Sequence, residues 1–345
     1  MAQNFAFDGE SLITDAQFRA GNGSLAMENP GELVVAKAEL ALLLDTALQQ
    51  FQGGLDPSAI IGRLTRDLHS LRRRSHVDVW NEITLIAQSH HVADFLHQDP
   101  LTRWSFDKPR GYSGDAHLLD FIYGTGDTSA AVAMSSDLGR AIYAYTRNAT
   151  SSVAVRERRD ILAERVDSIS KTSPAPIDVL SIASGHLREA AKSKALNEGG
   201  VRRWVAFDQD PISVGTVARD YRGTAVEAVN GSVKSLLGNR HDLTAFDFVY
   251  AAGLYDYLPA QVGVRLTRKC LSMLKPGGSF LFANFSDETA VDGYMETFMN
   301  WPLLLRSEDD MWKIAGEGAH GVDVGTRVWF GDNRDIVYCE ITKRD

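Results

Sequence analysis

The stretch Asp178-Val179-Leu180-Ser181-Ile182-Ala183-Ser184-Gly185-His186 decides the fold of this chain. It is an apolar run that ends in a turn of small residues. Further apolar runs follow within residues 204–211, 246–258 and 274–285, with helix-like stretches between them. Short apolar strands that alternate with helices are typical of a parallel sheet with crossover helices.

The order of these pieces predicts a nucleotide site. A strand that runs into a small-residue turn lets the backbone approach a ligand and puts a helix N-terminus beside it. Asp208 lies 208 − 185 = 23 residues after Gly185, and an acid at this place can accept hydrogen bonds from ribose hydroxyls. The alternative for Asp208 is a cap on the next helix. Ala183 and Arg188 stand where a dinucleotide site has glycine, so the turn favours a cofactor without phosphate over the pyrophosphate of a dehydrogenase.

The later blocks carry a family resemblance. Phe246-Asp247-Phe248-Val249 before a small-residue corner, and Leu274-Lys275-Pro276-Gly277-Gly278 before another strand, resemble class I S-adenosylmethionine-dependent methyltransferases over residues 155–345. The resemblance implies an α/β, Rossmann-like, seven-stranded sheet, S-adenosyl-L-methionine as cofactor and methyl transfer as the activity. Two strand-like runs at 325–330 and 336–341, joined by a turn at 331–335, fit the terminal antiparallel hairpin of that fold.

A narrower resemblance concerns the acceptor of the methyl group. Residues 108–115, residues 252–258 and Tyr294-Met295-Glu296 ahead of Trp301 and Arg306 resemble a bacterial methyltransferase-like family of 3-hydroxypalmitic acid methyl ester biosynthesis. This makes O-methylation of the carboxylate of a hydroxy fatty acid a candidate reaction. N-methylation of an amino or heterocyclic metabolite, and a non-catalytic fold that senses cofactor or metabolite, remain open.

The site residues follow from the strand ends. We expect the cofactor to be bound by Ser181, Ala183, Gly185, His186, Asp208, Gln209, Ser232, Val233, Ala251, Ala252 and Gly253. The expected catalytic or acceptor residues are Arg110, Tyr112, Asp115, Tyr255 and Asp256. Arg110 or Lys108 would hold a carboxylate acceptor, which needs no general base, whereas an amine or hydroxyl would need one. The alternative for the 108–115 block is a structured turn with Tyr112 buried.

Composition limits the partners. The net charge of −9 over 345 residues argues against a general nucleic-acid binder, so a small-molecule acceptor is expected. No metal is expected, because the histidines and the two cysteines, Cys270 and Cys339, lack ligand spacing. The N-terminus does not look like a signal peptide and no window is long enough for a membrane span. A cytoplasmic protein is therefore expected, and a homodimer is left open.

The first part of the chain reads as helical. Apolar residues at steps of three and four predict a helix over 31–51, and further helices are expected over 57–73, 77–96, 115–122 and much of 137–171. Residues 101–128 are expected to form a Gly-rich loop around the 115–122 helix. Residues 1–150 are expected to form a mostly helical cap or substrate domain that closes the acceptor pocket, followed by a methyltransferase domain over 151–345.

Overall fold

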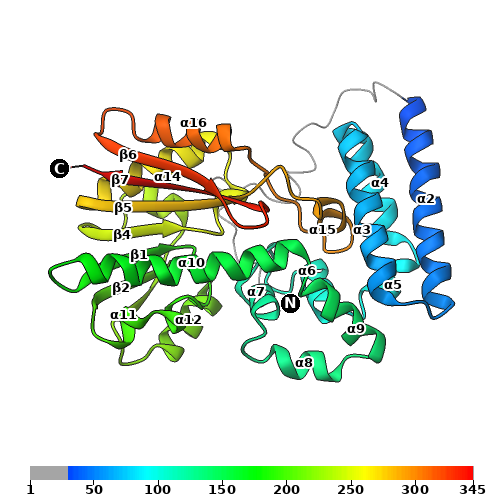
Figure 1. Ribbon diagram of the computed structural model, residues 1–345, viewed down its shortest axis with the longest axis horizontal. Helices are drawn as coiled ribbons and strands as arrows, with labels where there is room; N and C mark the ends of the chain where they lie inside the picture. The colour runs from blue at the N-terminus through cyan, green and yellow to red at the C-terminus, as the bar shows by residue number, and fades with distance from the viewer. Residues whose placement is uncertain (1–29, 345) are drawn as a thin grey trace. The chain divides into compact units, whose positions relative to one another are not determined.

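The computed structural model describes residues 30–344 and divides them into two compact units (Figure 1). The helical unit contains residues 30–153 and 289–302, and the sheet unit contains residues 154–288 and 303–344. A segment that lies near the C-terminus in sequence therefore belongs to the same unit as the N-terminal helices. The expected role of residues 1–150 as a cap stays a prediction, and residues 1–29 lie outside the described part.

The helical unit is built from short helices. Its elements are α2 (Pro30–Gln52), α3 (Pro57–Arg74), α4 (Val77–Ser89), α5 (Val92–Leu96), α6 (Pro100–Asp107), α7 (Ala116–Tyr123), α8 (Thr128–Met134), α9 (Asp137–Thr146) and α15 (Asp292–Thr297). The helices expected over 31–51, 57–73 and 115–122 are confirmed. The core-facing stripe of α2 explains the first: Ala36, Leu40, Leu44, Ala47 and Phe51 are buried.

Two local expectations were wrong. The single helix expected over 77–96 is interrupted, because His90 is extended at ψ 144° and its ring Nδ1 accepts a hydrogen bond from the Val92 N–H. Residues 100–107 are a helix and not a loop, since Asp99 caps α6 and Pro100 begins it. Helix α10 (Thr150–Thr172) follows α9, and near its start the Ser152 hydroxyl donates to the Thr146 carbonyl at 2.8 Å.

Helix α15 is fastened to α3 and α4 inside the helical unit. Asp292 lies 2.7 Å from the His69 ring, and Glu296 accepts from Arg72 at 2.8 Å and from the Trp80 indole at 2.5 Å. The two helices cross so closely that a Cβ on Gly293 would lie 2.6 Å from the backbone carbon of Leu68. These contacts explain why residues 289–302 leave the sheet unit.

The sheet unit holds a seven-stranded sheet in the order β3-β2-β1-β4-β5-β7-β6 (Figure 1). The strands are β1 (Ile177–Ile182), β2 (Val201–Asp208), β3 (Val226–Asn230), β4 (Phe246–Ala251), β5 (Leu274–Phe285), β6 (Val324–Phe330) and β7 (Ile336–Lys343). The first five are parallel, and β7 is antiparallel to both β5 and β6. This is the expected fold class, with its terminal antiparallel hairpin.

Two helical layers cover the sheet. Right-handed crossovers place the β1–β2–β3 connections and the β4–β5 connection on opposite faces. The connecting helices are α11 (Lys194–Asn197), α12 (Pro211–Asp220), α13 (Val233–Leu237) and α14 (Ala260–Met273), and α16 (Glu308–Gly318) packs on α14. The larger apolar core lies beneath α13, α14 and α16, and it includes both cysteines, as expected.

The sheet face that α10 covers is more polar than the opposite face. Asp167 of α10 accepts hydrogen bonds from Ser193 and from the Ala195 N–H of α11, and Arg165 of α10 pairs with buried Glu340 of β7 at 2.6 Å. Alternation along β7 therefore turns Cys339 toward one helical layer and Glu340 toward the other.

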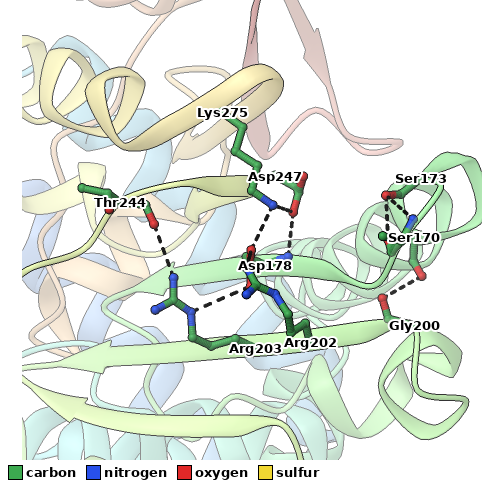
Figure 2. A network of polar contacts seen from close by, with 10 residues as sticks. Ser170, Ser173, Asp178, Gly200, Arg202, Arg203, Thr244, Asp247 and Lys275 are labelled. Atoms are coloured by element: carbon green, nitrogen blue, oxygen red, sulfur yellow. Dashed lines mark hydrogen bonds and ion pairs between the residues drawn. The ribbon is translucent and has the colours of Figure 1, made fainter.

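Charged side chains tie together the amino ends of the parallel strands (Figure 2). The Asp178 carboxylate accepts from Arg202 and lies 2.9 Å from the Lys275 ammonium, which also lies 2.6 Å from Asp247. Asp247 in turn accepts from the Asp178 backbone N–H at 2.7 Å. Strands β1, β2, β4 and β5 are thus cross-linked at the edge opposite to the nucleotide edge that the sequence predicts.

Candidate functional site

The carboxyl ends of β1 and β2 meet in one hydrogen-bonded unit. Asp208, the last residue of β2, accepts the Gly185 N–H through Oδ2 and the Asp210 N–H through Oδ1, both at 2.8 Å. Gly185 has a φ of 55°, which a glycine adopts without strain. The spacing of Gly185 and Asp208 in sequence therefore corresponds to a direct contact in space.

Two further polar atoms surround this contact. The Ser184 hydroxyl and the Gln209 side-chain oxygen are buried, and neither has a hydrogen-bond partner among residues 30–344. Burial raises the pKa of the Asp208 carboxyl above its usual value, while the N–H groups of Asp210 and Gly185 oppose that rise. Each carboxylate oxygen of Asp208 keeps a second lone pair, so the edge retains capacity to accept hydrogen bonds from a ligand.

The segment after β1 differs from the expectation in one respect. The expected helix N-terminus beside the turn is absent: residues 190–192 form only η1 (Ala190–Lys192), a single 3₁₀ turn. Ala183 and Leu187 adopt positive φ angles of 54° and 51°. The turn therefore keeps a left-handed backbone at Ala183, one of the two positions where glycine is missing, and also at Leu187. Any ligand here would meet loop N–H groups and not a helix dipole.

Ser232 and Val233, which follow β3, both have structural roles. The Ser232 hydroxyl accepts the Ser235 N–H and caps α13, and Val233 packs into the apolar core. A Cβ on Gly231 would lie 2.3 Å from the Phe207 ring, so this glycine lets the chain pass β2. Contact of Ser232 and Val233 with a cofactor stays a prediction.

The end of β4 contains the other expected residues. Ala251 is fully buried in the core and Ala252 is nearly so, whereas Gly253 is half-buried. Tyr255 is also in the core: its ring stacks on Phe282 and its hydroxyl lies 2.9 Å from that of Thr267. These contacts assign Tyr255 to packing and give its expected catalytic role no support.

Asp256 is a buried acid beside this corner. Its carboxylate accepts the Phe285 N–H at 2.6 Å, and Arg306 donates to the carbonyls of Tyr255 and Leu258, both at 2.5 Å. Burial raises the pKa of the Asp256 carboxyl to about 6, although Arg158, the Phe285 N–H and Arg306 oppose the rise. Asp256 thus both fixes the loop after β4 and remains titratable near neutral pH.

A buried polar group on the α10 face was missed by the sequence reasoning. The Tyr250 hydroxyl of β4 donates to Glu189 at 2.6 Å and lies 3.3 Å from the Trp204 indole nitrogen. Ser181 of β1, expected at the cofactor, is buried and pairs with Tyr250 in the sheet register. Burial raises the pKa of the Glu189 carboxyl, which Arg158 of α10 opposes. The available sequence signal for this polar group was Arg158, which interrupts the apolar stripe of α10.

His186 and the 108–115 block complete the expected set. His186 is buried, and its Nδ1 lies 3.4 Å from Arg188. In the helical unit, Asp115 caps α7 through the N–H groups of His117 and Leu118 and accepts from the Trp104 indole at 2.9 Å. Arg110 is buried with its Nε 3.8 Å from Asp115.

The two remaining residues of this block differ in environment. Tyr112 is half-buried. Burial lowers the pKa of the Lys108 ammonium to about 8. The block is therefore an ordered turn with two cations, and Asp115 serves as its structural acid.

Residues 30–344 contain neither a candidate metal cluster nor a candidate membrane-spanning helix. No cluster of three or more His, Cys, Asp or Glu side chains has the arrangement of a metal site in that part of the chain. None of its helices combines the length and apolarity needed to cross a membrane.

Comparisons with known proteins support the fold. A possible exported protein from Bordetella parapertussis is 16% identical, covers 90% of this chain and 97% of its own, and superposes with a TM-score of 0.53. Magnesium protoporphyrin IX methyltransferase from Synechocystis PCC 6803 is 12% identical, with 65% and 91% covered and a TM-score of 0.45.

A third similar structure is an S-adenosylmethionine-dependent methyltransferase from Leishmania major. It is 13% identical, with 65% and 81% covered and a TM-score of 0.41. No family model and no curated protein matches the sequence. The similarity to the Bordetella protein concerns the fold.

Proposed function

We propose that this chain is an S-adenosylmethionine-dependent methyltransferase that acts on a small molecule. The observation that carries the proposal is the Gly185–Asp208 contact at the carboxyl edge of the sheet. It lies at the carboxyl ends of β1 and β2, beside the switch point between β1 and β4 where the strand order reverses, and ligands of open α/β sheets bind at such switch points. The terminal antiparallel hairpin adds support, since it fits the methyltransferase resemblance and not a plain dehydrogenase.

The residues present suit this cofactor. Asp208 would accept from the ribose hydroxyls, and the unpartnered Ser184 and Gln209 oxygens lie in the adjacent loops. Gly185 and Gly253 leave the strand ends open to the amino-acid part, with Ala183, His186, Ala251 and Ala252 alongside. Ser232 and Val233 would meet the adenine. When bound, the cofactor supplies a methyl group made electrophilic by its sulfonium. The protein's own task is then to hold the acceptor close and exclude water.

For the acceptor, we propose a carboxylate, with a hydroxy fatty acid as the first candidate. The support is the pair of cations in the 108–115 block, where Arg110 is buried and burial lowers the pKa of Lys108 only to about 8. A guanidinium pairs with a carboxylate in a planar fork. Tyr112 belongs to the same block as these cations. If the acceptor is an amine or hydroxyl, Asp256, with a pKa of about 6, is the general base that we propose. Dimerisation and a cytoplasmic location stay predictions.

Methyl transfer from labelled cofactor tests the proposal. The protein is incubated with methyl-labelled S-adenosylmethionine and either 3-hydroxypalmitate or a metabolite extract, and the labelled product is identified. A labelled ester supports the carboxylate acceptor, and a labelled amine supports N-methylation. Cofactor binding with no labelled product from any acceptor would favour the sensor alternative.

The pH–rate profile separates the two chemistries. A carboxylate acceptor predicts a rate that is flat above the pKa of the acceptor, and an Arg110→Gln variant with a raised acceptor KM. Three results together would exclude the carboxylate acceptor. The rate would rise with pH through a pKa near 6, it would be lower in Asp256→Asn, and Arg110→Gln would leave the acceptor KM unchanged.

A further inference from the structure

One cation in the sheet unit stands out from its surroundings. The inward stripe of α10 is made of Ala154, Val155, Leu162, Ala163 and Val166, all buried. Arg158 occupies the same stripe, three residues after Val155 and four before Leu162, and it is only 6% exposed. A charged guanidinium in an apolar stripe carries a large desolvation cost unless something offsets it.

The protein itself offsets this cost only at longer range. Glu189 and Asp256 are the acids that act electrostatically with Arg158. Within residues 30–344, however, the Arg158 guanidinium makes no hydrogen bond and no close ion pair with either acid. Arginine carries five N–H donors in a rigid fork, so these donors remain available to a ligand.

The Arg158 guanidinium lies beside the carboxyl end of β4. Its Nη2 lies 3.5 Å from the place where a Cβ of Gly253 would stand. Gly253 follows β4, and Glu189, the acid on the other side, follows the β1 turn. Arg158 therefore lies near the carboxyl ends of β1 and β4, which border the switch point, whereas Asp208 lies at the end of β2.

We propose that Arg158 binds the carboxylate of the methionine part of the cofactor, a role that rests on the proposed function. In this arrangement Asp208 recognises the ribose end and Arg158 the amino-acid end. The fork geometry suits a carboxylate. Arg158 then selects S-adenosylmethionine and S-adenosylhomocysteine over adenosine thioethers that lack the carboxylate, which makes it a positioning and specificity residue.

Ligands with and without the carboxylate test this role. Binding of S-adenosylhomocysteine, of its decarboxylated analogue and of 5′-methylthioadenosine is measured by calorimetry for the full chain, for Arg158→Gln and for Arg158→Lys. Arg158→Gln should weaken S-adenosylhomocysteine binding by about tenfold to a hundredfold. The two ligands without a carboxylate should change by less than about twofold, and Arg158→Lys should recover part of the loss.

The matched control is Arg159→Gln, which removes the neighbouring arginine that pairs with Asp160 at 2.9 Å. It should leave all three affinities unchanged. An equal loss for all three ligands in Arg158→Gln would assign Arg158 to structure, and no loss for S-adenosylhomocysteine would overturn the proposal. If the unaltered protein binds neither S-adenosylhomocysteine nor 5′-methylthioadenosine, the proposed function fails and this inference fails with it.

Discussion

At the scale of single residues, Asp178 stabilises the amino edge of the sheet. Burial opposes its ionisation, but hydrogen bonds from Arg202 and Lys275 outweigh burial and hold the pKa of the carboxyl below its usual value. An acid with a lowered pKa stabilises the fold above its unfolded pKa of about 3.9, and loses that contribution as pH falls toward the folded value.

We therefore expect Asp178→Asn to lower the free energy of unfolding by about 1–3 kcal/mol at pH 7. The difference from the unaltered protein should shrink as pH falls from about 5 to 3. Urea unfolding at several pH values measures it, with the exposed Asp242→Asn as control. A difference independent of pH would show that the ion pairs do not contribute.

Ala183 illustrates a residue whose conformation its type does not predict. We inferred from the missing glycine that the turn would not approach a phosphate closely, yet Ala183 has the positive φ of a glycine. The left-handed region costs a non-glycine residue about 1–2 kcal/mol. A glycine avoids that cost, but its greater freedom in the unfolded chain lowers the free energy of unfolding by about 0.5–1 kcal/mol.

Ala183→Gly should accordingly be neutral or raise the free energy of unfolding by up to about 1 kcal/mol. Ala251→Gly, in the core end of β4, should lower it. Thermal unfolding of both variants checks the sign, and a clear loss of stability in Ala183→Gly would contradict the left-handed conformation.

At the scale of elements, the crossing of α15 and α3 depends on Gly293. A methyl group there would meet the backbone of Leu68 and His69 at 2.6 and 2.8 Å, and backbone cannot yield as a flexible side chain does. Gly293→Ala should therefore lower the free energy of unfolding by about 1–3 kcal/mol.

The matched control is Gly316→Ala in α16, where nothing lies within 4 Å of the added methyl. That change should be neutral or stabilising by up to about 1 kcal/mol, since alanine favours helix. Urea unfolding of the two variants compares them directly. Similar behaviour of both would mean that the crossing is loose.

Element types were predictable where periodicity was strong, and boundaries were not. The apolar runs of β1, β2, β4 and β5 and the stripe of α2 need no tertiary information. The helix break at His90–His91 depends on the His90 ring nitrogen, which accepts the Val92 N–H. The spacing of apolar residues does not predict such a contact. Asp99 before Pro100 was a readable helix start, directly before the stretch 101–128 that we expected to be mainly a loop.

At the scale of the whole molecule, the assignment of residues 289–302 to the helical unit was beyond sequence reasoning. Its cause is the set of ion pairs and the close crossing around α15, which join residues more than 200 positions apart. The Gly185–Asp208 half of the site was predictable because a strand–turn–strand spacing encodes it. The proposed role of Arg158 was not predictable, because this residue lies on α10, outside the strand–turn–strand motif.

A fragment of residues 154–345 should expose the apolar face of α15. In and directly after this helix, the buried apolar side chains are Tyr294, Met295, Phe298 and Met299. They belong to the helical unit, and the fragment lacks the rest of that unit. We expect this fragment to self-associate, and a version with 289–302 replaced by a Gly-Ser linker to be less associated. Size-exclusion chromatography distinguishes them, and a monodisperse unmodified fragment would contradict this division of the chain.

The most direct test of the central claim is calorimetric binding of S-adenosylhomocysteine to the full chain, without added metal, and to its Asp208→Ala variant. We expect saturable binding with one molecule per chain. Loss of a charged hydrogen-bond acceptor should weaken it by about tenfold to a hundredfold in the variant, whereas Asp220→Ala, which removes an acid paired with Arg188, should bind normally. Folded, unaltered protein that gives no binding heat, or an Asp208→Ala variant with unchanged affinity, would contradict the account.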